Sequence, residues 1–314
     1  MVTIVCLGLS CRGVREPPLR IGAVLFPGCE LFRLAEAQGY FGNARLQMID
    51  YRSPSDLTRD FRNGVVDAAA VTLDYLLEPG ERARLHHVVL VMDFSEGADA
   101  VVAGPAVRDI SALAGRRVGV TDDALGAVML ARALQAGKVQ ADGVVRVRLD
   151  VTEQEKAFAE GRVDALVTYE PIRSRLVSAG AHQIFSSAEI PGEIVDVLVT
   201  ERSVADERAQ AIGALVDGWF RARDALARDP GAAARILAAR QGMTPPEFLS
   251  ALSGLRFPTR AENRTLLAEA HPGLEPALAK LRAVLHETGA MRPGVPVAQV
   301  VFDGRFVLPG AGRP

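Results

Sequence analysis

The stretches Arg20-Ile21-Gly22 and Val66-Asp67-Ala68 decide the fold of this chain, because both return 97 residues further on as Arg117-Val118-Gly119 and Val163-Asp164-Ala165. A Phe-x-x-Gly pattern precedes the second stretch in each half, at Phe61, Gly64, Phe158 and Gly161. One constant spacing over several positions is typical of a duplicated unit. In each unit a buried-strand pattern comes first, and a helix pattern that stops at glycine precedes a second apolar strand. The sequence therefore predicts two similar α/β lobes in tandem, with a cleft between them.

The composition excludes several classes of protein. The chain has 314 residues, 49% hydrophobic and 24% charged, which is typical of a folded protein with one or two domains and a substantial core. A net charge of −2 gives no electrostatic attraction for a polyanion, so we expect no nucleic acid partner. There is no Gly-rich nucleotide loop, and the cysteines Cys6, Cys11 and Cys29 lack paired metal-ligand spacing. We expect neither a cofactor nor a metal ion.

Residues 1–18 are interpreted as a truncated signal or lipoprotein-like segment. Met1 to Ser10 is apolar and uncharged, and Cys11 follows the small residue Ser10, as in a lipoprotein signal. The usual basic segment before the apolar run is missing, so a frayed N-terminus is the alternative. The expected location is periplasmic or membrane-anchored and extracytoplasmic.

The strand and helix patterns divide the rest of the chain into two lobes. Lobe one is predicted to contain residues 19–97 and 194–314, and lobe two residues 98–193. Two polar, Gly-containing stretches, Asp93 to Ala98 and Gly192 to Val199, are predicted to carry the chain between the lobes. From Asp206 onward the pattern is helical, and we expect this extension to pack on the outside of lobe one and leave the cleft free.

Three segments carry a family resemblance that covers about Leu19 to Asp229. They are Cys29 to Phe41, the turn Leu113-Ala114-Gly115-Arg116-Arg117-Val118-Gly119-Val120, and Val163-Asp164-Ala165 with Tyr169-Glu170-Pro171. Taken in order, they resemble solute-binding proteins of the nitrate/sulfonate/taurine class of ABC importers, and the related binders of thiamine pyrimidine precursors. Tyr169 departs from the tryptophan of the family pattern.

The resemblance implies a periplasmic binding protein type II fold. Such a fold has two Rossmann-like lobes joined by a two-strand hinge, here with a C-terminal helical extension. It further implies a small-molecule ligand and delivery to the permease and ATPase subunits of an importer. We expect a monomer.

The candidate ligand-binding residues follow from the strand pattern, since ligands of open α/β sheets bind beyond the carboxyl ends of the strands. They are Phe26, Cys29, Glu30, Thr72, Asp74, Asp93, Phe94, Thr121, Asp122, Asp123, Tyr169, Glu170 and Glu193. This set is rich in acids, and the loops concerned contain no Lys or Arg. Carboxylates accept hydrogen bonds and do not donate them, so we expect a neutral ligand with N–H donors or a cationic one.

Alternatives remain open for single residues and for the function. Asp122 or Asp123 is equally explained as the N-cap of the following helix, and the aromatic residues and Cys29 as core packing. An enzyme on the same fold, similar to the menaquinone-pathway dehydratases or pyrimidine synthases, is the first rival function. No Ser-His or Cys-His pairing can be placed, and the set of catalytic residues is empty. A ligand-sensing module for a partner signalling protein is the second rival.

Overall fold

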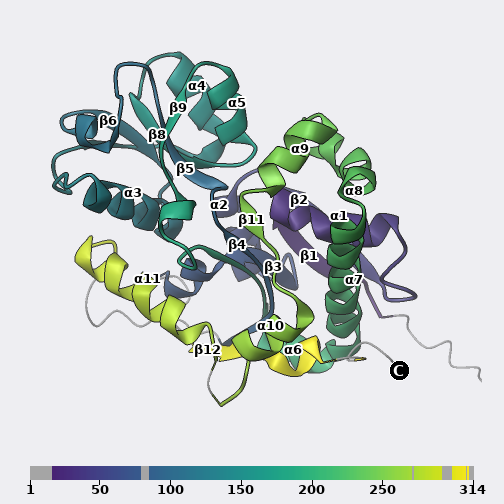
Figure 1. The fold of residues 1–314 in the computed structure, drawn as a ribbon. Helices are drawn as coiled ribbons and strands as arrows, with labels where there is room; N and C mark the ends of the chain where they lie inside the picture. The colour runs from purple at the N-terminus through teal and green to yellow at the C-terminus, as the bar shows by residue number, and fades with distance from the viewer. Residues whose placement is uncertain (1–15, 79–84, 271, 292–298, 309, 311–314) are drawn as a thin grey trace, which may run out of the picture.

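The computed structural model describes residues 16–78, 85–270, 272–291, 299–308 and 310, and these form two α/β lobes (Figure 1). Residues 1–15 of the predicted export segment, including Cys11, lie outside the described residues. No helix in the described part is long and apolar enough to span a membrane. The predicted fold class is confirmed: each lobe has its own mixed sheet with helices packed on it.

Lobe one is built on a sheet with the strand order β11-β4-β10-β3-β1-β2, and β12 also pairs with β4. Its strands are β1 (Leu19–Val24), β2 (Leu46–Tyr51), β3 (Ala68–Thr72), β4 (Leu85–Ser95), β10 (Val195–Glu201), β11 (Leu255–Arg256) and β12 (Gln299–Phe302). Its helices include α1 (Glu30–Ala37), α2 (Pro54–Arg62), α6 (Arg202–Glu207), α7 (Ala209–Arg228) and α8 (Pro230–Leu237). Strands β1, β2 and β3 run parallel, whereas β10 is antiparallel to β3 and β4.

Lobe two is built on a smaller sheet with the strand order β7-β6-β8-β5-β9. Its strands are β5 (Asp99–Ala103), β6 (Arg117–Val120), β7 (Val145–Arg148), β8 (Ala165–Tyr169) and β9 (His182–Ser186). Its helices are α3 (Ala124–Ala136), α4 (Gln154–Ala159) and α5 (Ile172–Ser178). Strand β5 runs antiparallel to both of its neighbours, β8 and β9.

The repeated residues perform the same task in both lobes. Arg20 Nε donates to Asp67 Oδ2 at 3.0 Å, and Arg117 Nε donates to Asp164 Oδ2 at 3.1 Å. In each pair the arginine backbone N–H binds the same carboxylate oxygen, at 2.7 Å and 2.8 Å. Each clasp joins the start of one strand to the residue before its parallel neighbour: β1 to β3 in lobe one, and β6 to β8 in lobe two. The duplication therefore preserves an ion pair that aligns two parallel strands.

The first crossing between the lobes is shorter than the sequence pattern suggests. Asp93 and Phe94 were expected in a polar hinge, but both belong to β4 and are buried, and only Glu96–Ala98 connects β4 to β5. Gly254 braces this connection, since its carbonyl accepts hydrogen bonds from the N–H groups of Glu96 and Ala98. A side chain on Gly254 would collide with the backbone at Ala98.

The C-terminal extension departs from the prediction in two ways. It contains β11 and β12, which add to the lobe-one sheet, as well as helices α9 (Pro245–Leu252), α10 (Arg260–Leu266) and α11 (Glu275–Glu287). Helix α11 does not stay on lobe one: it packs against α3 of lobe two as well as against the 3₁₀ turn η2 (Leu73–Leu77) (Figure 1). The apolar face of α11, with Leu278 and Leu281, is buried there.

We expect the Asp67→Ala substitution to destabilise lobe one by roughly 1–3 kcal/mol, because it leaves the backbone N–H of Arg20 without its acceptor and the guanidinium with only the Gly64 carbonyl. The measurement is urea-induced unfolding. Asp164→Ala is the matched change in lobe two, and we expect a smaller loss there, because this clasp is more exposed to water. Unchanged midpoints in both variants would contradict a role for the two clasps in stability.

Candidate functional site

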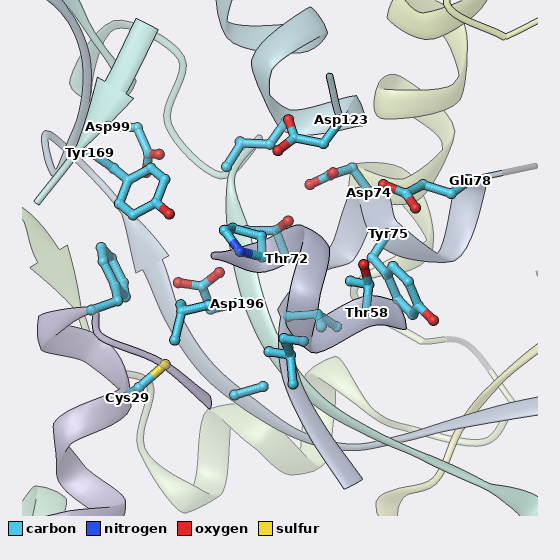
Figure 2. A pocket seen from close by; sticks show the side chains of 17 residues that line it. Cys29, Thr58, Thr72, Asp74, Tyr75, Glu78, Asp99, Asp123, Tyr169 and Asp196 are labelled. Atoms are coloured by element: carbon cyan, nitrogen blue, oxygen red, sulfur yellow. The ribbon is translucent and has the colours of Figure 1, made fainter. Parts of the chain in front are cut away.

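A cavity lies between the lobes where several strands end (Figure 2). About 70 Å³ of it is open to the centres of water molecules, several times the roughly 10–15 Å³ that one water needs. The ends of β1, β3 and β8 and the beginnings of β5 and β10 contribute to its wall. The polar residues that line it are Thr58, Thr72, Asp74, Tyr75, Glu78, Asp99, Asp123, Tyr169 and Asp196.

The charge of this cavity is entirely negative. Asp74, Asp99, Asp123 and Asp196 line it together with Glu78, which also pairs with Arg62 at 3.5 Å, and no Lys, Arg or His is among the lining residues. Asp74 is 3% exposed and Asp99 is 5% exposed, so water screens these carboxylates poorly. Figure 2 shows aspartate side chains from both lobes around one space.

Burial shifts the titration of these acids in a consistent direction. Burial raises the pKa of Asp74 to about 7 and that of Asp99 to about 6, and the nearby charge of Asp123 adds to both shifts. The pKa of Asp123 is itself raised, mainly by burial. Asp74 and Asp99 therefore stay partly protonated at a pH where ordinary aspartates are fully ionised.

Asp123 has two roles at once. Its Oδ1 accepts hydrogen bonds from the Gly126 N–H at 2.7 Å and from the Thr121 hydroxyl at 2.8 Å, so it is the N-cap of α3. The same side chain lines the cavity. The two sequence interpretations of this residue, cap and cleft residue, are therefore compatible.

Aromatic and apolar side chains form one wall of the cavity. The rings of Phe26 and Tyr169 meet edge to face, with centroids 6.0 Å apart and an interplanar angle of 82°. Cys29 also lines the cavity, below Tyr169 in Figure 2. Burial, followed by the charges of Asp196 and Asp93, raises the pKa of its thiol well above the ordinary value. The thiol is therefore protonated and unsuited to act as a nucleophile.

Four predicted acidic site residues do not face the cavity, because arginines bind them elsewhere. Glu30 binds Arg240, Glu170 binds Arg173, Glu193 binds Arg132, and the exposed Asp122 binds Arg148. A carboxylate that already has a guanidinium partner adds little negative potential to the cleft. Asp122, Glu170 and Glu193, which were expected to approach the ligand, are therefore not among the residues that line this cavity.

The remaining predicted residues lie behind or beside the cavity. Asp93 is fully buried behind Asp196, and Phe94 stacks under the guanidinium of Arg256 at 4.1 Å. Thr121 orients Asp123 and lines a second hollow, which is bounded by the end of α11. Of the predicted set, Phe26, Cys29, Thr72, Asp74, Asp123 and Tyr169 line the cavity itself.

Sequence reasoning missed Asp99 and Asp196. It considered only the carboxyl ends of strands, but β5 and β10 run antiparallel to their neighbours and present their amino ends at the same edge. Asp99 thus pairs with Tyr169 at the end of β8, and Asp196 with Thr72 at the end of β3. A lone aspartate in each apolar stretch, Asp99-Ala-Val-Val-Ala and Val195-Asp196-Val-Leu-Val, was the available signal.

Ser53 and Asp150 join the two lobes by a hydrogen bond away from the crossing strands, where Ser95 and Ser187 also bind each other. The Ser53 hydroxyl donates to Asp150 Oδ2 at 3.0 Å, and the two residues are 97 positions apart. They occupy equivalent places in the repeat, since Ser53 caps α2 and Asp150 caps the turn that leads into α4. The described conformation therefore has its lobes in contact.

The sequence matches one family pattern over residues 13–240, which is more than two thirds of the chain. The chain belongs to the NMT1-like family. No curated protein shows significant sequence similarity to it.

The fold is similar to those of solved structures. The alkanesulfonate-binding protein SsuA from Xanthomonas axonopodis pv. citri, bound to MOPS, matches with a TM-score of 0.74 and 18% identity, over 92% of this chain and 99% of that one. The periplasmic aliphatic sulphonate-binding protein SsuA from Escherichia coli matches with a TM-score of 0.71 and 14% identity, over 90% and 96%. The desulfurization enzyme DSZB matches with a TM-score of 0.62 and 17% identity, over 90% of this chain and 95% of that one. These matches agree with the predicted resemblance at the level of family and fold.

We expect the stability of the empty protein to fall as the pH rises from about 4 to about 7. The pKa values of Asp74 and Asp99 are about 7 and about 6 in the folded state, against about 3.9 in an unfolded chain, so the folded state binds more protons in this window. Acids whose pKa values are lowered in the folded state, such as Asp67, change the stability only below this pH window. The measurement is the free energy of unfolding against pH, with Asp74→Asn and Asp99→Asn expected to flatten the slope. A wild-type stability that rises across the window would contradict the assignment.

Proposed function

We propose that this protein is the solute-binding component of an ABC importer and captures a small nitrogen-containing ligand, cationic or neutral with N–H donors, between its lobes. The observation that carries the proposal is a cavity lined by four aspartates and one glutamate, with no basic side chain among its lining residues. The family and fold neighbours support the transport role. The protein would act outside the cytoplasm, as a monomer that docks on permease and ATPase subunits.

Electrostatics favours this ligand class over a sulfonate or nitrate. Two like unit charges about 4 Å apart repel by roughly 4 kcal/mol at an effective dielectric constant of about 20. An anion in this cavity would face several carboxylates and no cation. A ligand with N–H donors supplies what the carboxylates lack, and the Phe26 and Tyr169 rings provide surface for a planar or cationic group, each worth about 0.5–2 kcal/mol.

The lobes of this binding protein are proposed to be residues 19–97 with 194–314, and residues 98–193. These boundaries separate the strands of the two sheets. We further propose binding without chemical conversion of the ligand. The thiol near the cavity is buried and protonated.

The test is a thermal-shift screen of the full chain with small amines, amidines and nitrogen heterocycles, against sulfonates and nitrate. Stabilisation by the nitrogen compounds alone is the expected result. Mass spectrometry of the bound compound after incubation decides between binding and catalysis, since a solute-binding protein returns its ligand unchanged. Stabilisation by a sulfonate or nitrate, or recovery of a converted product, would overturn the corresponding part of the proposal.

We expect Asp99→Asn to weaken binding of a stabilising nitrogen compound by about 10- to 100-fold, the effect of losing a charged hydrogen-bond partner worth about 1.5–3 kcal/mol. Titration calorimetry measures it. Asp122→Asn is the matched control, because Asp122 lies outside the cavity, with its side chain 69% exposed and paired to Arg148. Equal losses in both variants would mean that overall charge, and not the cavity, attracts the ligand.

Closure of the lobes should depend on the bond between Ser53 and Asp150. We expect Ser53→Ala to shift the empty protein toward an open form with a larger radius of gyration, and to weaken ligand binding less than Asp99→Asn does. Small-angle X-ray scattering with and without ligand measures both states. Asp56, three residues further on, is exposed, and Asp56→Ala serves as a control at the same helix start. Identical scattering of the Ser53→Ala variant and the wild type would contradict the latch.

A further inference from the structure

Two carboxyl groups face each other in the wall of the cleft. Asp93 on β4 and Asp196 on β10 are directly opposite in the antiparallel register, so their side chains lie on the same face of the sheet. Asp93 is 0% exposed and Asp196 is 9% exposed. The register shifts between Asp196 and Val197, and such irregularities redirect side chains at binding sites.

Apart from the carboxyl group of Asp196, no donor from the described residues reaches Asp93, the inner member of this pair. Neither carboxylate oxygen of Asp93 accepts a hydrogen bond from an N–H group or hydroxyl of those residues. Gly28 covers it so closely that a Cβ on Gly28 would collide with Asp93 Oδ2. The pair therefore opens only toward the cavity, which Asp196 lines.

The groups around the pair do not neutralise it. Asp99 on β5, Asp74 on η2 and the Cys29 thiol are the titratable side chains that act on it, and none is a cation. The arginines of neighbouring elements are engaged elsewhere: Arg240 binds Glu30 and Asp50, and Arg256 binds Glu96. Two adjacent buried carboxylates without a cation cannot both ionise, and the usual solution is one shared proton.

We propose that Asp93 and Asp196 share one proton in the empty cleft, and that an organic monocation with N–H donors, a primary ammonium or an amidinium, displaces this proton on binding. The O–H bond of the shared proton breaks, its electrons stay on the carboxylate, and the proton leaves to solvent. The N–H groups of the cation then bind the freed oxygens. One positive charge replaces another, so the net charge of the pair and its occupant does not change.

Two further observations support the exchange. Burial raises the pKa of Asp93, and burial together with the charge of Asp93 raises the pKa of Asp196, which is the direction a proton-holding pair requires. Among the described residues, no group of three or more His, Cys, Asp or Glu side chains is arranged to hold a metal ion, which favours an organic cation. The inference rests on the proposed function, and it names the ligand class and its coupling to pH.

The proton itself can be detected without any ligand. Infrared spectra of the empty full-length protein at about pH 7 should show the carbonyl stretch of a protonated carboxyl group. Asp93→Asn, Asp196→Asn and the double variant should each remove the same amplitude, because one proton is shared. Asp142→Asn, at an exposed position of lobe two, should remove none. No loss in either single variant, or a double loss in the double variant, would overturn the shared proton.

The exchange is tested on the wild type by titration calorimetry with acetamidinium and propylammonium chlorides, in phosphate and in cacodylate buffer, which contain no amine and differ in ionisation enthalpy. The buffer dependence should show one proton released per cation bound, with affinity rising about tenfold per pH unit below the pKa of the pair. Tetramethylammonium, a cation without N–H donors, should bind at least tenfold more weakly. Binding without proton release would overturn the inference and leave the proposed function intact. If neither cation binds and a sulfonate does, the proposed function fails, the exchange fails with it, and the infrared comparison alone decides whether the pair holds a proton.

Discussion

The site depends on one topological constraint: each lobe contains a strand that enters it from the other lobe and runs against its neighbours. Because the chain crosses between β4 and β5 and again between β9 and β10, β5 and β10 both begin at the cleft. Their first residues then lie beside the last residues of the parallel strands, as the pairing of Asp99 with Tyr169 and of Asp196 with Thr72 shows. Two aspartates enter the cleft wall without any loop to carry them, on rigid and buried backbone.

The lobes could be predicted from the sequence because their requirements are local and repeated. An arginine at the start of one strand and an aspartate just before another form the same clasp in both halves, and Gly22 and Gly119 leave room for the equivalent side chains of Val66 and Val163. Helix starts were equally readable, since Asp123 caps its helix as its position suggested. Asp99 and Asp196 could not be predicted in this way. Which end of a strand faces the cleft depends on the direction of the strand, and hydrophobic periodicity does not encode that direction.

The sequence predicts an acidic site, but it does not identify which acidic residues line the cavity. Acidic residues are frequent near the strand ends, yet an acid that is paired with an arginine adds little negative potential to the cleft. Which acids are paired depends on the tertiary structure. Glu170 and Arg173 are close in sequence, whereas Glu30 binds an arginine 210 residues away and Glu193 one 61 residues away. The position of α11 was missed for a related reason, since its apolar face fits α3 of lobe two as well as η2 of lobe one.

The unpaired aspartates have an energetic consequence for selectivity. Without a ligand, burial opposes the ionisation of these aspartates, so they keep protons that fully solvated aspartates would release at the same pH. A cation relieves this penalty, whereas an anion adds roughly 4 kcal/mol of repulsion for each carboxylate at about 4 Å. The aromatic wall contributes only about 0.5–2 kcal/mol per contact, which is too little to reverse that difference. Under the proposed function, charge would select the class of ligand and the Phe26 and Tyr169 rings its shape, so changes in the rings should alter which nitrogen compound binds without admitting sulfonates.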